Sequence, residues 1–172
     1  MSKSIVIAGG VHAGIEAALA IARMGGSAVI VTIEPTAIGR MSCNPAIGGL
    51  AKGHIVKEID ALGGIMGLAA DVSGLQYKTL NKSKGRAVWS PRAQVDKLKY
   101  SQYVKNSVQS NKNIKIVAGE VVNFCVDNHK VVAATLKDGT KIACSGLIIT
   151  SGTFLNGKIH IGSSHYSAGR MG

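Results

Sequence analysis

The chain has 172 residues, of which 46% are hydrophobic and 17% are charged, and 22 of them are glycine. This length and apolar content suit one large folded domain and exclude a disordered chain. The net charge of +11 fits either a solvated basic surface or an anionic partner, and nucleic acid is favoured over a membrane because no basic amphipathic helix stands out. No apolar run could cross a bilayer and no signal segment opens the sequence, so we expect a cytoplasmic protein without membrane contact.

The first part of the sequence, residues 4–34, predicts a βαβ unit. Residues 4–8 are apolar and β-branched, which is typical of a strand buried on both faces. Residues 12–24 carry apolar side chains at helical spacing and end at two glycines, and residues 28–33 form a second apolar run. The whole unit has the length that a parallel crossover needs.

The middle of the sequence predicts loops and two helices. A glycine-rich loop covers residues 35–51, followed by a helix over 52–62 and a strand over 74–80. The basic stretch NKSKGR, residues 81–86, is expected to be a loop. Pro91 is expected at the start of a second, more polar helix that runs to residue 110.

The last part predicts β-structure. Four short apolar runs with turns between them indicate a strand and then an antiparallel β-meander over about residues 120–145, and residues 147–150 are a buried return strand. This order of elements favours an α/β fold, a three-layer FAD/NAD(P)-binding Rossmann-like domain with a small antiparallel meander. The sequence stops in a glycine-rich stretch without a terminating element, so we expect the fold to be truncated and its C-terminal remainder to be absent.

The sequence GGVHAG at residues 9–14 resembles a dinucleotide-binding turn. Gly9 would allow the tight turn and Gly14 the close packing of helix on strand, while the helix N-terminus offers N–H groups to a phosphate. Glu34, at the end of the second strand, could accept ribose hydroxyls. Val11 replaces the usual middle glycine, and its side chain would push a phosphate outward and resist a positive φ. A turn without a ligand is therefore the alternative interpretation. His12 would face either the ligand or solvent, and a surface position is favoured.

The three cysteines show no CxxC spacing, so we expect reduced thiols and no metal site. Cys43 lies in a polar loop ahead of the helix predicted over 52–62. The polarity of that helix N-terminus, together with Lys52, would favour a reactive thiolate. Cys125 and Cys144 are expected to be small buried hydrophobic residues in the meander strands.

Four blocks of the sequence carry a family resemblance that covers essentially all of its length. They are GGxHAGxEAA, MSCNPAIGGxxKGHxVKEIDALGG, LNxSKGxAV with RAQxD, and GTFLxGKIHIG with a later GR. The chain resembles the N-terminal part of the glucose-inhibited division protein A family, the large FAD-dependent subunit of the bacterial tRNA uridine-5-carboxymethylaminomethyl modification enzyme.

The resemblance implies a function and a set of partners. The family binds FAD and, with a GTPase partner, installs an aminomethyl-type group on C5 of the wobble uridine (position 34) of tRNA. It takes the one-carbon unit from methylenetetrahydrofolate, uses NADH to reduce the flavin, and forms a homodimer. A related folate- and FAD-dependent tRNA uridine methyltransferase is an alternative, but it matches the cysteine and GTFL blocks less well. A non-catalytic truncated remnant is a further alternative.

The resemblance also assigns roles to residues of this sequence. The FAD-binding turn corresponds to Gly9, Gly10, Val11, His12, Ala13 and Gly14, and a further FAD contact falls on Val121. Cys43 corresponds to a functionally important cysteine, a nucleophile toward C6 of the uridine or a partner in proton transfer. Phosphate contacts are expected from the basic loop and its surroundings, at Lys82, Lys84, Arg86 and Arg92.

The sequence departs from the family pattern at two motif positions and in its length. Val11 replaces the fingerprint glycine, and Arg86 replaces a proline, which loosens the turn and adds charge. Family members are much longer, with an inserted NADH-binding domain, a second cysteine, a C-terminal FAD-contacting segment and a helical domain that docks the GTPase. We therefore expect the chain to be inactive by itself.

Overall fold

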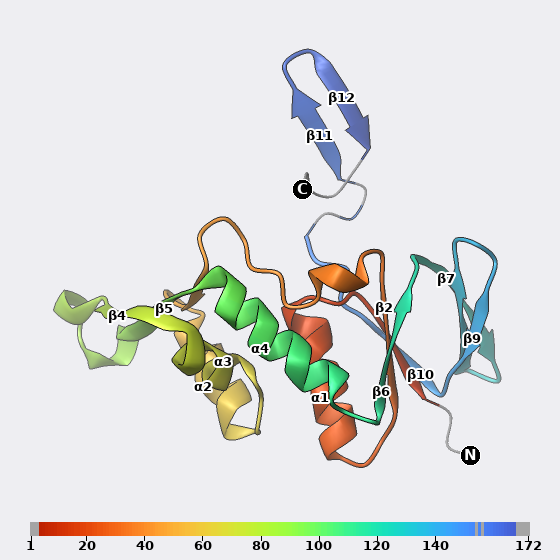
Figure 1. Ribbon diagram of the computed structural model, residues 1–172, viewed down its shortest axis with the longest axis horizontal. Helices are drawn as coiled ribbons and strands as arrows, with labels where there is room; N and C mark the ends of the chain where they lie inside the picture. The colour runs from red at the N-terminus through yellow and green to blue at the C-terminus, as the bar shows by residue number, and fades with distance from the viewer. Residues whose placement is uncertain (1–3, 154, 156, 168–172) are drawn as a thin grey trace.

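The computed structural model describes residues 4–153, 155 and 157–167. Its centre is a parallel sheet of four strands in the order β10-β1-β2-β6 (Figure 1). These strands are β1 (Ile5–Ala8), β2 (Ala28–Thr32), β6 (Ile114–Ala118) and β10 (Gly146–Ile149). Because β10 pairs with β1, residues from late in the chain complete a sheet that the N-terminal βαβ unit begins.

Alternate residues of the sheet pack against different layers. Ile7 and Ile30 belong to a core shared with the helices, whereas Val6, Val29 and Val31 belong to a second core on the opposite face. The first layer is formed by α1 (His12–Arg23) and α4 (Lys97–Gln109). The other is the antiparallel meander of β7 (Val121–Asp127), β8 (Lys130–Leu136) and β9 (Lys141–Ala143). The predicted three-layer α/β class with a meander is confirmed.

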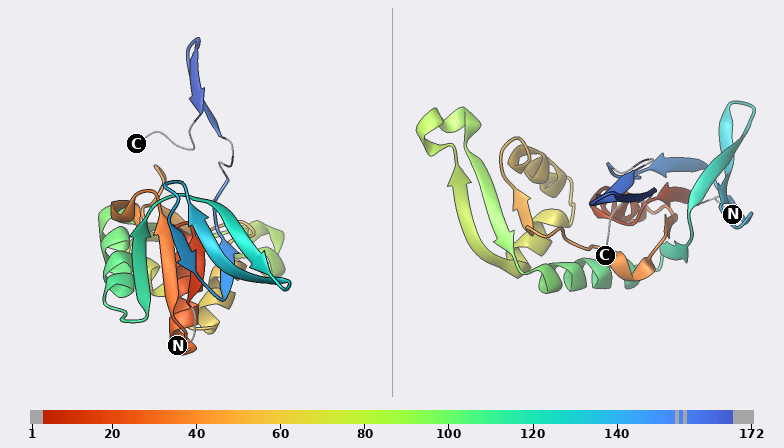
Figure 2. Two further views of the ribbon diagram at one scale, coloured as in Figure 1. Left: turned by 90° about the vertical axis from the view of Figure 1, so that its right-hand side faces the viewer. Right: turned by 90° about the horizontal axis from the view of Figure 1, so that it is seen from above.

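A second, antiparallel sheet in the order β3-β5-β4 lies at one end of the molecule, away from the meander (Figure 2). Its strands are β3 (Ala46–Gly48), β4 (Gly74–Leu80) and β5 (Ser90–Val95). Two helices accompany it, α2 (Gly53–Ala61) and α3 (Met66–Ser73). Three short 3-10 turns are η1 (Pro35–Ala37), η2 (Lys82–Lys84) and η3 (Arg86–Val88). The sequence predicted α2 and β4 but neither β3 nor α3.

The helix expected to start at Pro91 begins later. Residues 90–95 are strand β5 because they pair with β3 on one side and β4 on the other. The helix α4 begins after Asp96, whose carboxylate accepts the N–H groups of Leu98 and Lys99 at 2.9 and 3.0 Å. These hydrogen bonds hold the pKa of Asp96 below its usual value. An acidic N-cap, rather than a proline at the first helical position, therefore starts α4.

The two sheets are joined through the helical layer. Glu16 of α1 accepts the N–H groups of Ile65 and Met66 at 3.0 and 2.8 Å, and so satisfies the N-terminus of α3. Tyr100 of α4 is buried in the same core as residues of both sheets. Its burial, and secondarily the charge of Glu16, raises the pKa of its phenol. One continuous core thus fixes the antiparallel sheet relative to the parallel sheet.

A β-hairpin of β11 (Lys158–Ile161) and β12 (Ser164–Ser167) projects from the rest of the molecule (Figures 1 and 2). It contains the KIHIG part of the GTFLxGKIHIG block. Phe154 and Asn156 of that block, and the later GR at 169–170, lie outside the described residues. No helix in the part of the chain that the structure describes is long and apolar enough to cross a membrane.

Candidate functional site at the sheet edge and the cysteine loop

The glycine turn between β1 and α1 is required by close packing. Gly9 has a φ of +120°, and a Cβ there would overlap the carbonyl oxygen of Thr150 at the end of β10. A Cβ on Gly14 would overlap the carbonyl oxygen of Gly9. The Thr150 hydroxyl donates to the carbonyl oxygens of Ala8 and Gly9, at 3.0 and 3.2 Å. These contacts hold the N-terminus of α1 against the carboxyl edge of the sheet.

Val11 is accommodated without backbone strain. Its φ is −105° and its ψ is −166°, which is extended backbone, so this turn does not require the positive φ that a valine would resist. Gly9 alone of the turn residues adopts a positive φ. The side chain of Val11 is 49% exposed at the N-cap position, and no side chain caps α1. The N–H groups of the first turn therefore remain open to an anion, and the valine side chain stands beside them.

The sequence favours a surface position for His12, but in the structure its side chain points inward. Its ring is half-buried, with Nε2 3.2 Å from Sδ of Met41 and the ring centroid 5.7 Å from that of Tyr100. Burial lowers the pKa of the imidazole. The side chain therefore packs inward, toward the cysteine loop and α4, while the backbone of His12 and the exposed Ala13 form the first turn of α1.

Glu34 and Val121 follow neighbouring strands at the same edge as the glycine turn. Glu34 lies two residues after the end of β2, and Val121 opens β7 just after β6, where the Gly119 N–H donates to the Thr32 carbonyl at 3.0 Å. Because carboxyl ends of neighbouring parallel strands lie together, the fold brings these residues to the same edge as the turn. Val121 is half-buried and packs on the second core.

One oxygen of Glu34 is already engaged. Its Oε1 accepts the Thr36 hydroxyl at 2.8 Å and an Arg40 N–H at 2.7 Å. The Thr36 hydrogen bond, and after it Arg40, holds the pKa of the Glu34 carboxyl below its usual value. The carboxylate is thus ionised and oriented, and its other oxygen can accept a hydroxyl.

Cys43 is exposed in a loop whose two sides are anchored. Ile38 and Met41 are buried before it, and the Ser101 hydroxyl of α4 donates to the Gly39 carbonyl at 2.8 Å. Cys43 lies ahead of α2, as expected, but the strand β3 lies between the cysteine and the start of that helix. Its thiol is therefore presented by an anchored loop rather than by a helix end.

The other two cysteines differ from each other. Cys144 is 1% exposed and belongs to the second core, as expected for a small buried residue. Cys125 of β7 is only half-buried.

The glycines after Cys43 fix the end of its loop to β5. A Cβ on Gly48, which has a φ of +80°, would overlap the Pro91 carbonyl oxygen. The Gly49 N–H donates to that same oxygen at 2.8 Å, and the buried Ser90 hydroxyl donates to the Gly49 carbonyl. Close approach of two backbones therefore explains Gly48 of the pair in CNPAIGG, and a φ of +95° explains Gly49.

The four basic residues assigned from the sequence lie on a strand and on the turns that lead into it. Lys82, Lys84 and Arg86 lie in the 3-10 turns that connect β4 to β5. Arg92 lies within β5, where its Nη2 donates to Oδ1 of Asn44 at 3.3 Å, next to Cys43.

Trp89 is a surface residue that sequence reasoning missed in the basic connection. Its Nε1 donates to the Lys82 carbonyl at 3.2 Å, and the Arg86 guanidinium lies 5.7 Å from its ring centre. Its position close to the basic stretch 81–86 could have indicated a nucleic-acid contact, because aromatic side chains beside cations are typical of such surfaces.

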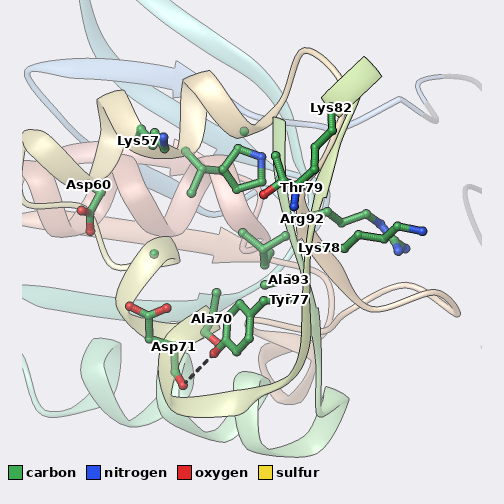
Figure 3. Close-up of a pocket in the computed structure, with 16 residues that line it drawn as sticks. Lys57, Asp60, Ala70, Asp71, Tyr77, Lys78, Thr79, Lys82, Arg92 and Ala93 are labelled. Atoms are coloured by element: carbon green, nitrogen blue, oxygen red, sulfur yellow. Dashed lines mark hydrogen bonds between the residues drawn. The ribbon is translucent and has the colours of Figure 1, made fainter. Parts of the chain in front are cut away.

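A cavity of about 620 Å³ lies between α2, α3 and the antiparallel sheet (Figure 3). Its walls include apolar residues such as Ile47, Val56 and Ala93. The charged residues around it are Lys57, Asp60, Asp71, Lys78, Lys82 and Arg92. This cavity could not be predicted from the sequence, because it depends on strands β3 and β5 and helix α3.

The parallel sheet, with the glycine turn and α1 at its carboxyl edge, has the Rossmann-like architecture of the FAD/NAD(P)-binding class. The family model for glucose inhibited division protein A matches residues 3–172, and the chain belongs to this family.

Two curated relatives are tRNA uridine 5-carboxymethylaminomethyl modification enzymes MnmG. The chain is 48% identical to that of Protochlamydia amoebophila and 50% identical to that of Aquifex aeolicus, over 98% of its own length in each case. A crystal structure of Aquifex aeolicus GidA superposes with a TM-score of 0.91 at 49% identity, covering 98% of this chain and 28% of that one. The chain spans 27% of the length of the two curated relatives.

Proposed function

We propose that the chain is the N-terminal, FAD-binding portion of an enzyme that adds a carboxymethylaminomethyl-type group to C5 of the wobble uridine of tRNA. The observation that carries this proposal is the 48–50% identity to two MnmG enzymes over 98% of the chain. The remaining parts of the reaction belong to the same proposal: NADH and methylenetetrahydrofolate as co-substrates, a GTPase as partner and a second copy of the chain in a dimer.

The sheet edge has the features that FAD needs. The pyrophosphate would lie at the N-terminus of α1, against the backbone of Gly9, Gly10, Val11, His12, Ala13 and Gly14. The free oxygen of Glu34 would accept ribose hydroxyls, and Val121 would contact the cofactor from the neighbouring strand. Bound FAD supplies the redox chemistry of the one-carbon transfer. Val11 weakens this site in the proposal, because its side chain occupies space that a glycine would leave to the phosphate.

Cys43 is the proposed reactive group of the chain. Its exposed sulfur, once deprotonated, would add to C6 of the uridine, so that the C5–C6 π electrons move toward the O4 carbonyl and C5 becomes nucleophilic. The same residue could instead take part in proton transfer at C5. A wobble base is single-stranded and can leave its stack at low cost, which suits a thiol on a surface loop.

The basic surface is the proposed tRNA contact. Lys82, Lys84, Arg86 and Arg92 would bind backbone phosphates, and the net charge of +11 would steer the RNA toward the chain. Trp89, which is 38% exposed between these cations, offers a face on which a base can stack.

A chimera tests the proposal. Residues 3–172 replace the matching segment of Aquifex aeolicus MnmG, and wobble-uridine modification is measured by mass spectrometry of digested tRNA. We expect modification by the chimera, an increase with Val11→Gly, and none with Cys43→Ser. A chimera that folds and binds tRNA but leaves the uridine unmodified, with or without Val11→Gly, would contradict the proposal.

A further inference from the structure

Lys78 of β4 and Arg92 of β5 form a pair of cations directly opposite each other across two antiparallel strands. Residues in register on neighbouring strands project from the same face of a sheet. Figure 3 shows both side chains extending in the same direction, away from the helices that carry Lys57, Asp60 and Asp71. Their charged ends therefore lie on the open face of this sheet, outside the cavity that their stems border.

The charge of this pair is not compensated within the described residues. Neither Lys78 nor Arg92 belongs to an ion pair there, and the hydrogen bond from Arg92 goes to Asn44, a neutral amide. The next register pair on the same face, Gln76 with Gln94, is also neutral. Like charges directly opposite each other on a sheet are unfavourable, so an anion between them would relieve a repulsion as well as add contacts.

The orientation of Arg92 is fixed by the cysteine loop. Its stem passes beside Gly49, where a Cβ would be 3.7 Å from its Cδ, and its guanidinium is held by Asn44, the residue after Cys43. A planar guanidinium and a flexible ammonium on one face form a combination suited to a phosphate, with two N–H donors from the arginine and a point charge from the lysine. An anion bound here would lie beside the loop that carries the thiol.

We propose that Lys78 and Arg92 together bind a single phosphate of the RNA backbone, next to the nucleotide that is presented to Cys43. This inference rests on the proposed tRNA-modifying function and adds a phosphate subsite to it. The cations of the η2 and η3 turns, which follow the near end of β4 and lead into β5, would bind other phosphates of the same RNA. Lys78 thereby becomes a positioning residue for the base, although nothing in the motif pattern had singled it out.

The test measures binding of an unmodified tRNA transcript to the 172-residue chain over a range of salt concentrations. The variants are Lys78→Gln, Arg92→Gln and the double variant, and Lys141→Gln is the matched control because it removes an exposed cation from a strand of the meander. We expect each single substitution to weaken binding about tenfold, since a hydrogen bond to a charged group is lost. The control should bind as the wild type does.

The double variant distinguishes one shared phosphate from two. For one phosphate, it should bind little more weakly than the single variants, and the slope of log K against log salt should fall by about 1. Unchanged binding in both single variants would overturn the proposal. A loss equal to the product of the two single losses, with a slope change of about 2, would also overturn it, because the two cations would then contact separate phosphates.

Inorganic phosphate separates this subsite from the proposed function as a whole. The Tm of the wild type should rise in phosphate, whereas that of Lys78→Gln should not. In phosphate-free buffer Lys78→Gln should melt no lower than the wild type, and a clearly lower Tm would mean a structural role for Lys78 and contradict the proposal. If the wild type binds no tRNA, the proposed function fails. Phosphate stabilisation that is still lost in Lys78→Gln would then show a free-anion site and overturn the assignment to RNA.

Discussion

Replacing Val11 with glycine should strengthen FAD binding while slightly weakening the fold. The valine side chain is 49% exposed beside the open N–H groups of α1, and no side chain caps that helix. Removing its Cβ and two methyl groups would let a phosphate approach the backbone. The valine side chain then acts as an overpacked contact toward the ligand. Its removal should make the free energy of FAD binding more favourable by about 1–3 kcal/mol, which lowers the Kd about 5- to 150-fold.

The effect on stability should have the opposite sign. Val11 has a φ of −105°, so no backbone strain is released when glycine replaces it. Glycine instead gives the unfolded chain more freedom, which should lower the free energy of unfolding by about 0.5–1 kcal/mol. Val11→Ala is the matched control, because it removes the methyl groups and keeps the Cβ.

The two effects can be measured on the same preparations. FAD is titrated into the 172-residue chain with flavin fluorescence as the signal, and stability is measured by urea unfolding without FAD. We expect weak binding by the wild type, an intermediate Kd for Val11→Ala and the tightest binding for Val11→Gly. A Kd for Val11→Gly equal to or weaker than that of the wild type would refute the steric argument.

Three further predictions concern the fold around the site. Gly14→Ala should lower the free energy of unfolding by about 1–3 kcal/mol, because its Cβ would overlap the Gly9 carbonyl oxygen. Gly146→Ala is the control for thermal melts of both variants and should cost much less, because the nearest atom to its Cβ would be 3.9 Å away. Glu16→Ala should cost about 1–3 kcal/mol in urea unfolding, because the buried N–H of Ile65 loses its acceptor, and Glu16→Gln should recover part of that loss. Burial lowers the pKa of His12 from 6.5, so below pH 6.5 the unfolded chain binds more protons than the folded chain, and the free energy of unfolding should fall as pH decreases. His12→Gln should flatten this part of the plot of stability against pH. An unchanged plot would contradict the assignment of the effect to His12.

The parallel sheet and the meander could be predicted from the sequence because their signals are local. The strands of the βαβ unit are continuous apolar runs, since alternate residues such as Val6 and Ile7 are buried in different cores. The turns of the meander carry their own sequence signals. The carboxyl-edge position of Glu34 then follows from the topology of parallel strands.

The antiparallel sheet could not be predicted, because pairing rather than local preference decides its structure. The segment SPRAQV contains a proline and three polar residues, which is typical of a helix start, yet hydrogen bonds from both neighbours make it the central strand. The position of β5 depends on contacts with residues 46–48 and 74–80. The cavity and the pairing of Lys78 with Arg92 depend on the same contacts.

This sheet also explains why the glycines follow Cys43 so closely in the sequence. The cysteine loop must end in a strand that lies against β5, and Gly48 allows that approach because any side chain there would overlap the Pro91 carbonyl. The residue after Pro91 on β5 is Arg92, whose guanidinium donates a hydrogen bond to Asn44, the residue after Cys43. The loop that presents the thiol and the strand that presents the cations are thus held by one set of backbone contacts. A substitution such as Gly48→Ala should therefore disturb Cys43 and the Lys78–Arg92 pair together. In the described part of the chain, none of these three side chains is hydrogen-bonded to residue 48.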